Sequence, residues 1–126
     1  MILIDTDILV WYLRGDSNAA RLIDGQSSFC LSAVTYMELV QGMRDKRELR
    51  ALKDSLRIWR AEVIAIDEKT STLAMLYMDR FFLSHGIRLA DALIGAAAVS
   101  LGLTLATANE KHYKMLPDLK LSRFSP

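Results

Sequence analysis

The sequence predicts an α/β fold, a three-layer α/β/α sandwich around a central, mostly parallel sheet. Short apolar runs, typical of buried strands, alternate with longer segments of helical periodicity, and this order places parallel strands between two layers of helices. The chain of 126 residues and 14.2 kDa suits a single domain over residues 1–126 with a sizeable core. Its content of 52% hydrophobic and 25% charged residues excludes intrinsic disorder.

The amino-terminal half alternates apolar runs of three residues with helices that begin after a capping residue and end near a glycine. In order, the expected elements are a strand at 2–4, a helix over 6–14 stopped at Gly15, a short helix capped within 16–18 and closed by Gly25, a strand at 29–31, and a helix capped by Ser32 that runs to about Gly42.

The carboxy-terminal half repeats this alternation. Its first helix shows a leucine and tryptophan stripe at spacings of 3, 4 and 3. The expected elements are that helix over 44–60, a strand at 63–66, a long helix capped by Asp67 and ended by Gly86, an alanine-rich helix over 90–101 closed by Gly102, a strand at 103–106, and an edge strand at 119–121 after Pro117.

Cysteine content, hydropathy and charge exclude several protein classes. The single cysteine, Cys30, excludes an internal disulfide framework and a zinc site of several thiolates, and suits a reducing cytoplasm. Asp5 and Asp7 interrupt the apolar run at residues 1–4, which does not fit a secretory signal. The longest uncharged stretch, residues 92–108, is shorter than the ~20 apolar residues that a membrane span needs. We therefore expect a cytoplasmic protein with no membrane partner. The net charge of +1 leaves a nucleic-acid partner open.

Three carboxylates stand out by their positions. Asp5 follows a buried strand and should emerge at the edge of the sheet where ligands bind in such folds, although it also suits a cap of the next helix, helped by Thr6 and Asp7. Asp91 lies in the first turn of the most apolar helix, where it is partly desolvated and needs a partner. Glu38 lies mid-helix at the border of the buried face, or is an ordinary exposed glutamate.

If these three carboxylates converge, they form an all-oxygen site without a cluster of His or Cys. Such hard ligands suit Mg²⁺ or Mn²⁺ rather than Zn²⁺. A site of this kind activates water and neutralises phosphate charge.

Four segments resemble the motifs of one family. They are the strand followed by Asp5-Thr6, Glu38-Leu-Val-Gln-Gly, Leu89-Ala-Asp-Ala-Leu-Ile-Gly-Ala, and Leu105-Ala-Thr-Ala-Asn-Glu-Lys-His-Tyr. Together, in this order and spacing, they resemble the PIN-domain ribonucleases, of the VapC-like toxin kind found in type II toxin–antitoxin pairs. The last segment is similar to the family's Thr-x-Asn-x-x-Asp-Phe motif, and the resemblance covers essentially the whole chain.

The resemblance implies a PIN-like fold and a Mg²⁺- or Mn²⁺-dependent endoribonuclease in which Asp5, Glu38 and Asp91 hold the metal. It implies that the supporting residues Thr107 and Asn109 orient the carboxylates, and we include Thr6 among the supporting residues. We expect in-line hydrolysis that leaves 5′-phosphate and 3′-hydroxyl ends. The implied partners are an RNA substrate, an antitoxin protein and a second copy of the chain in a homodimer.

His112 departs from the family pattern, because many relatives carry a fourth acidic residue there. This departure leaves the number of metal ions, one or two, open. His112 either contacts a phosphate or moves a proton, or is a partly buried polar residue that caps the last strand. Glu110 is the acid in this segment that could replace the missing fourth one, but it lies two positions before His112.

A basic ridge is the other candidate for contact with RNA. Residues 44–60 carry a net charge of +4, and four arginines recur there at helical spacings: Arg47, Arg50, Arg57 and Arg60. They form either a track for the phosphate backbone or a solvated helix face with ordinary ion pairs.

Two other functions are compatible with these residues. A catalytically degenerate PIN-like module would bind RNA or protein without cleavage, with His112 marking the decay. A phosphatase of the haloacid-dehalogenase type would use Asp5 as nucleophile and Asp7 as the second acid, but no glycine follows this pair and no Asp-Asp motif appears later.

Overall fold

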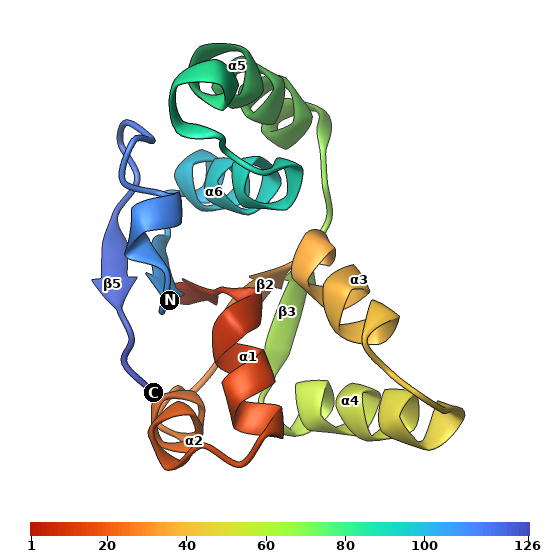
Figure 1. Ribbon diagram of the computed structural model, residues 1–126. Helices are drawn as coiled ribbons and strands as arrows, with labels where there is room; N and C mark the ends of the chain where they lie inside the picture. The colour runs from red at the N-terminus through yellow and green to blue at the C-terminus, as the bar shows by residue number, and fades with distance from the viewer.

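The computed structural model describes all residues, Met1 to Pro126. The chain forms five strands, six α-helices and one short 3₁₀ helix, η1, and Figure 1 shows how they are arranged. In chain order they are β1 (Ile2–Ile4), α1 (Thr6–Leu13), α2 (Ser17–Asp24), β2 (Phe29–Ser32), α3 (Ala33–Gln41), α4 (Lys46–Ile58), β3 (Ala61–Ile64), α5 (Glu68–His85), α6 (Leu89–Leu101), β4 (Thr104–Thr107), η1 (Glu110–His112) and β5 (Leu121–Arg123). None of the helices has the length and apolar character that crossing a membrane requires.

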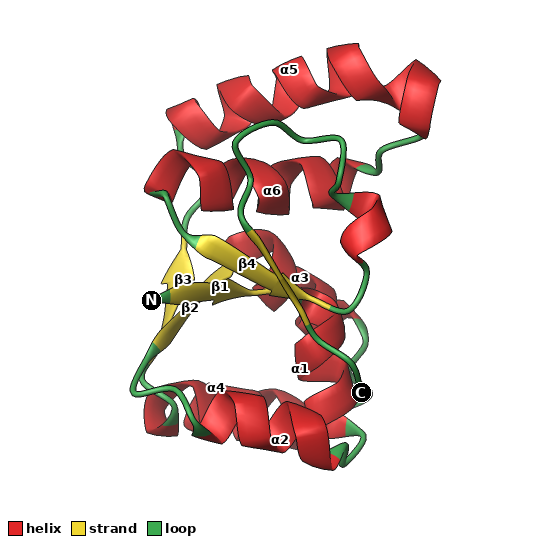
Figure 2. Cartoon of the chain, turned by 90° about the vertical axis from the view of Figure 1, so that its left-hand side faces the viewer, coloured by secondary structure: helices red, strands yellow, loops and turns green.

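The strands form one sheet in the order β3-β2-β1-β4-β5, and every neighbouring pair is parallel. Helices α5 and α6 cover one face of the sheet, and α2 and α4 lie on the other side (Figure 2). The predicted three-layer α/β/α sandwich is therefore confirmed.

Two apolar clusters hold the layers together. Leu3 of β1 belongs to the cluster shared with α5 and α6, whereas Ile4 belongs to the cluster shared with α1, α2 and α4. This alternation follows from the two-residue period of a strand whose two faces are both covered. Because β1 is central and buried, the acid that follows it emerges only at the carboxyl edge of the sheet.

Helix caps follow the sequence closely. The side chains of Asp16, Ser32 and Asp67 each accept a hydrogen bond from a backbone amide in the first turn of α2, α3 and α5, at 2.9, 3.0 and 2.8 Å respectively. Gly86 and Gly102 end α5 and α6 in the left-handed conformation, with φ of 67° and 65°. These local signals act within a few residues, which explains why the sequence places the helices well.

The strand bounds are less accurate. The third strand runs over Ala61–Ile64 rather than 63–66, because its register with β2 pairs Ala61 with Phe29 and Ile64 with Ser32. The last strand lies at 121–123 rather than 119–121, and β4 ends one residue later than expected. Both β3 and β5 are edge strands, so pairing with a single neighbour, and not their own hydropathy, sets their limits.

The carboxyl ends of β1 and β4 meet at a switch point in the sheet. β1 pairs with β2 on one side and with β4 on the other, and the chain reaches these neighbours by separate connections. Parallel α/β sheets form ligand crevices at such points. Asp5 follows β1 and Thr107 ends β4, and the Asp5 amide donates a hydrogen bond to the Ala106 carbonyl at 3.0 Å.

Candidate active site

Asp5 lies at this switch point and faces two hydroxyl groups. Its Oδ1 accepts a hydrogen bond from the Thr6 amide at 2.8 Å, so the expected capping of α1 occurs. Its Oδ2 lies 2.8 Å from the Thr107 hydroxyl and 3.0 Å from the Tyr113 hydroxyl. Asp5 is only 6% exposed. Capping therefore accounts for one oxygen and leaves the other for interactions across the sheet edge.

Asp7 is a second acid at this edge. Its Oδ2 accepts hydrogen bonds from the Ala108 amide at 2.9 Å and from Asn109 Nδ2 at 2.8 Å. Its Oδ1 is buried and has no hydrogen-bond partner. The backbone amide of Asn109 in turn donates to the Thr107 hydroxyl at 3.0 Å. That hydroxyl lies 2.8 Å from Asp5 Oδ2 and 3.3 Å from Asp7 Oδ2, so its single proton is directed mainly at Asp5. The turn after β4 thus holds both acids that flank the start of α1.

Asp91 reaches the site from the first turn of α6. Its Oδ1 lies 3.2 Å from the Tyr113 hydroxyl, so one phenol group lies between Asp5 and Asp91. Gly95 permits this arrangement, because a Cβ at that position would meet Leu116 Cδ1 at 2.5 Å and the Tyr113 ring at 3.7 Å. The segment after β4 can therefore pack closely against α6 and deliver a buried hydroxyl to two carboxylates.

Glu38 approaches from α3 and is exposed to solvent. Its Oε1 accepts a hydrogen bond from the Thr6 hydroxyl at 2.7 Å, and the buried Thr35 hydroxyl lies 2.9 Å from the same Thr6 oxygen. Since a carboxylate only accepts, the Thr6 hydroxyl donates to Glu38 and is free to accept from Thr35. Thr6 thereby links the carboxylate on α3 to the start of α1.

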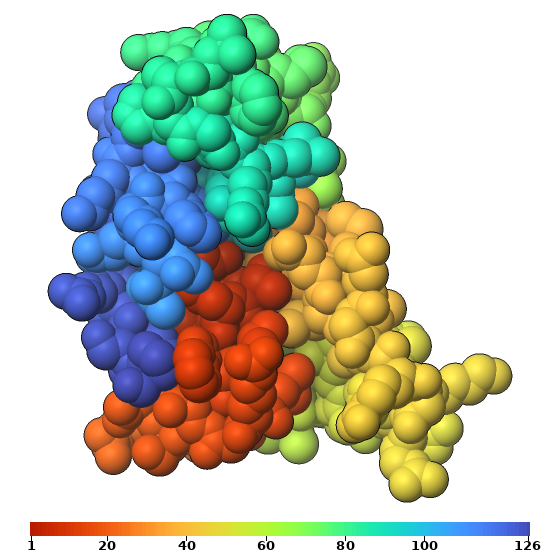
Figure 3. Space-filling view, viewed as in Figure 1, coloured from red at the N-terminus to blue at the C-terminus, as the bar shows by residue number.

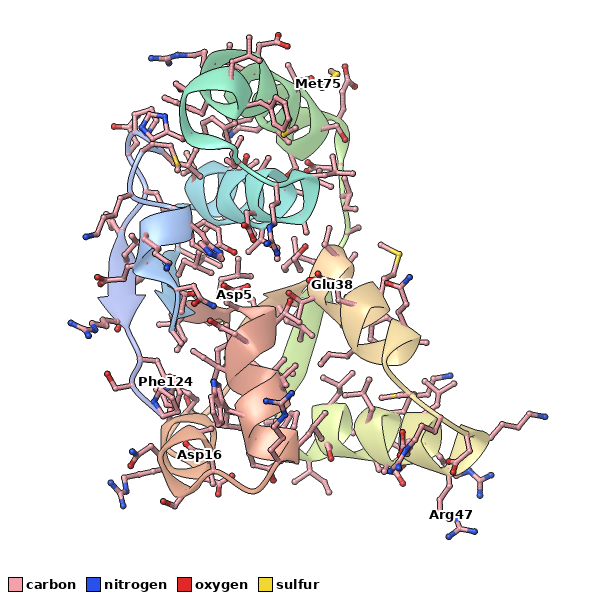
Figure 4. All side chains as sticks on the ribbon, viewed as in Figure 1. Asp5, Asp16, Glu38, Arg47, Met75 and Phe124 are labelled. Carbon is pink, nitrogen blue, oxygen red and sulfur yellow. The ribbon has the colours of Figure 1, made fainter.

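A hollow of about 360 Å³ opens where these side chains meet, and we call it the acidic hollow. The surface is visibly hollowed where the starts of α1, α3 and α6 meet (Figure 3), and Asp5 and Glu38 lie in this region in Figure 4. Its lining includes four carboxylates, Asp5, Asp7, Glu38 and Asp91, together with Thr6, Val10, Trp11, Arg14, Arg88, Ala90, Asn109 and His112. A larger, more apolar hollow of about 620 Å³ between α1, α3 and α4 shares Val10, Arg14 and Glu38 with it.

Burial leaves this negative charge poorly compensated. Burial, and then the charge of Asp7, raise the pKa of the Asp5 carboxyl to about 7 against the hydrogen bonds that it accepts. Burial also raises the pKa of the Asp7 and Asp91 carboxyls above their usual range. For Asp91, the charge of His112 and the hydrogen bond from Tyr113 oppose this rise. A cation in the hollow would stabilise the ionised form of all three.

The donor set fits a hard divalent cation, although it is not a preassembled cage. No three of the His, Cys, Asp and Glu side chains lie close enough to ligate one ion together as they stand. Mg²⁺ needs only one or two protein carboxylates, because it retains waters and binds substrate phosphates. The unpartnered Oδ1 of Asp7 and the desolvated Asp5 and Asp91 supply such oxygens. The residues present therefore fit Mg²⁺ or Mn²⁺ and lack the nitrogen and sulfur ligands of zinc.

His112 lies at the rim of the hollow. Its Nδ1 is 3.5 Å from Asp91 Oδ2, and its side chain is 35% exposed. The ring therefore stands beside the carboxylate of Asp91 and can reach solvent. Glu110, the other acid of this segment, does not line the hollow.

The four ridge arginines lie elsewhere. Arg47, Arg50 and Arg57 are exposed on α4, Arg60 follows the end of that helix, and none of them lines the acidic hollow. Arg57 forms an ion pair with Asp54 on its own helix. Figure 4 shows Arg47 at the lower right edge of the molecule, whereas Asp5 lies near its centre. The structure thus does not bring this ridge together with the acids.

Sequence reasoning missed two residues of the site, the acid Asp7 and the phenol Tyr113. Asp7 follows Asp5 by two residues, and its position in the sequence indicates only helix capping or the second acid of a phosphatase. Tyr113 is almost fully buried, at 1% exposure, and its hydroxyl is the only polar atom of a ring packed in the core. A tyrosine directly after His112 in the last motif was the signal for it, since a buried phenol seeks a hydrogen-bond partner.

Comparison with known proteins decides the family. Residues 2–115 match the PIN domain family. The chain belongs to the PIN-domain family. This PIN domain is 35% identical to Ribonuclease VapC19 of Mycobacterium tuberculosis over 95% of this chain and 98% of the relative. It is 40% identical to Ribonuclease VapC10 of the same organism over 95% of this chain and 91% of the relative.

Solved structures share the fold of this PIN domain. VapBC2 from Rickettsia felis, bound to a DNA fragment from its promoter, superposes with a TM-score of 0.82 at 20% identity, covering 99% of this chain and 100% of that one. A toxin–antitoxin complex from Klebsiella pneumoniae gives a TM-score of 0.79 at 22% identity, covering 94% and 95%. The family assignment leaves no support for the phosphatase alternative.

Proposed function

We propose that this PIN domain is a Mg²⁺- or Mn²⁺-dependent endoribonuclease and the toxin of a toxin–antitoxin pair. The ribonuclease relatives support the reaction type and the toxin–antitoxin neighbours support the biological role. The observation that carries the metal dependence is the convergence of Asp5, Asp7, Glu38 and Asp91, from three separate segments, on one hollow. Bringing like charges together costs free energy, and a divalent cation offsets that cost and then attracts the anionic phosphodiester.

The bound cation would supply Lewis-acid charge to the scissile phosphate and lower the pKa of a coordinated water. Asp5 and Asp91 are the carboxylates best placed to hold it, because Tyr113 and Thr107 fix their oxygens at the carboxyl edge of the sheet. Glu38 stands at the exposed side of the hollow, where it can orient a water through its oxygen that does not bind Thr6. His112 is positioned at the rim to donate a hydrogen bond to a phosphate oxygen.

Cleavage of a mixed pool of tRNA and mRNA by the purified protein tests this proposal. Reactions in Mg²⁺, in Mn²⁺ and in EDTA are compared for the wild type, Asp5→Asn and Asp16→Asn. Asp16 is the matched control, because it also caps a helix but lies away from the acidic hollow (Figure 4). We expect metal-dependent cleavage in the wild type and in Asp16→Asn, and loss of at least two orders of magnitude in Asp5→Asn.

Calorimetric titration with Mn²⁺ separates the remaining outcomes. Cleavage that persists in EDTA, or in Asp5→Asn at the wild-type rate, would refute the metal site. No cleavage together with no Mn²⁺ binding would favour the degenerate module that binds RNA or protein without cutting. Mn²⁺ binding without cleavage of the pool would direct the search to a narrower RNA substrate.

We also assign the antitoxin to the apolar hollow between α1, α3 and α4. This hollow is lined by Leu13, Leu39, Met43 and Leu52, and it borders the acidic hollow at Glu38, so a bound segment would lie against the active site. Leu13 is 56% exposed, and the change Leu13→Glu should therefore preserve folding and cleavage. Inhibition by the co-expressed antitoxin should be lost in this variant; full inhibition would refute the assignment.

A further inference from the structure

A second polar hollow adjoins the acidic hollow, and we call it the basic hollow. It measures about 320 Å³ and is lined by His85, Gly86, Arg88, Asp91, Lys111, His112 and Met115. Arg88, Asp91 and His112 line both hollows, so the two form one continuous depression. Its lining contains one carboxylate, at the border with the acidic hollow, against an arginine, a lysine and two histidines.

Tertiary structure, and not sequence proximity, assembles the basic hollow. Gly86 ends α5 in the left-handed conformation, at φ 67°, so the chain turns sharply between His85 and Arg88. The 3₁₀ helix η1, which follows β4, supplies Lys111 from the other side. Arg88 and Lys111, the two cations that are charged at any neutral pH, therefore lie just before α6 and just after β4, at the two ends of the α6–β4 segment.

These two cations have no carboxylate partner. The chain forms three ion pairs: two within α4 and its amino-terminal flank, and one between His112 and Asp91. Arg88 and Lys111 are exposed and take part in none of them, nor in any side-chain hydrogen bond. Arg14, at the far end of the acidic hollow, is likewise outside any ion pair. Cations thus flank the acids on both sides and remain available to an anionic ligand.

We propose that the basic hollow binds the RNA phosphate next to the scissile one, with Arg88 and Lys111 as its contacts, an inference that rests on the proposed ribonuclease function. The argument is electrostatic: an acidic hollow repels RNA, and adjacent unpaired cations offset that repulsion and set the register of the strand. The bound RNA strand then runs from Arg14, across the four carboxylates of the acidic hollow, to Lys111. The arginine ridge on α4 lies outside this path.

Salt titration of RNA binding tests the inference. A fluorescein-labelled single-stranded 12-nucleotide RNA of mixed sequence is bound in EDTA, and its anisotropy is followed between 0.05 and 0.3 M KCl. Arg88→Ala and Lys111→Ala are compared with Arg80→Ala and Lys114→Ala, which remove exposed cations of the same kinds that line neither hollow. Each contact to a phosphate of a single strand contributes about 0.7 to the slope of log K against log salt. We therefore expect each test variant to lower the slope by about 0.7 and to weaken binding about fivefold at 0.1 M salt.

Mn²⁺ titration and a second polyanion distinguish the outcomes. Lys111→Ala should bind Mn²⁺ within twofold of the wild type, because Lys111 does not line the acidic hollow. Arg88→Ala should bind Mn²⁺ no more weakly than the wild type, because it removes a positive charge that acts on Asp91. The inference would be overturned if the test variants bound RNA with the same affinity, and the same slope of log K against log salt, as the control variants. In that case, metal-dependent cleavage by the wild type would still support the proposed function. Unchanged RNA binding with weakened binding of poly-L-glutamate would also overturn it and would assign the basic hollow to an acidic protein segment. An absence of RNA binding and of cleavage in the wild type would refute both.

Discussion

Asp5 is expected to destabilise the metal-free protein, so its removal should stabilise the fold while abolishing cleavage. In Asp5→Asn, the amide oxygen can still accept from the Thr6 amide and cap α1. The amide nitrogen can donate to the Thr107 or Tyr113 hydroxyl, because both can rotate to accept. The variant therefore removes the charge and preserves the shape of the site.

The magnitude follows from the pKa of Asp5. Burial and Asp7 raise it from its ordinary value of 3.8 to about 7. The pKa of Asp5 is higher in the folded than in the unfolded protein. At low pH the carboxyl is protonated in both states and its burial carries no charge penalty. The free energy of unfolding therefore falls as pH rises from about 4 to about 7, where the unfolded state loses this proton first. Each unit of pKa corresponds to 1.36 kcal/mol, so the cost reaches about 4 kcal/mol at pH 8 and is about 1 kcal/mol at pH 4.5.

Urea unfolding in EDTA at pH 4.5 and pH 8 measures this effect for the wild type, Asp5→Asn and the control Asp16→Asn. The free energy of unfolding of Asp5→Asn should exceed that of the wild type by up to about 4 kcal/mol at pH 8 and by about 1 kcal/mol at pH 4.5. Saturating Mn²⁺ should reduce the difference, since ligand binding stabilises only the wild type. A difference that is the same at both pH values, or a less stable Asp5→Asn at pH 8, would refute the reasoning.

Three further predictions concern Tyr113, the cap of α4 and the exposed face of α5. Tyr113→Phe removes a hydrogen-bond donor to the carboxylates of Asp5 and Asp91. At pH 8 this loss should cost about 1.5–3 kcal/mol, or roughly 6–11 °C in the melting temperature of a domain of this size. Tyr77→Phe is the control, because Tyr77 is also buried but does not line the acidic hollow. Asp45→Ala removes the cap of α4, and should lower the melting temperature by about 4 °C without changing RNA cleavage. Phe82 and Leu83 are 52% and 95% exposed on α5, and we propose that two copies of the chain pair through this face. Phe82→Glu should then yield a monomer by sedimentation, whereas an unchanged mass would reject that face.

The sequence by itself determined the helices and their order. Asp16, Ser32 and Asp67 cap the helices they were expected to cap, and Gly86 and Gly102 end the two that follow the third strand. Such signals act over a few residues, so no knowledge of the rest of the chain is needed. The alternation of these helices with apolar runs was sufficient for the fold class, because parallel strands need helical crossovers.

Only the tertiary structure decided the limits of the edge strands and the contacts within the site. The ends of β3 and β5 depend on the strand each one pairs with, which local hydropathy does not encode. The roles of Asp7 and Tyr113 depend on the turn after β4 and on its close packing against Gly95 of α6. The basic hollow at Arg88 likewise exists only because the turn after α5 meets η1. These interactions join residues far apart in the chain, and their geometry is set when the sheet order and helix packing bring those residues together.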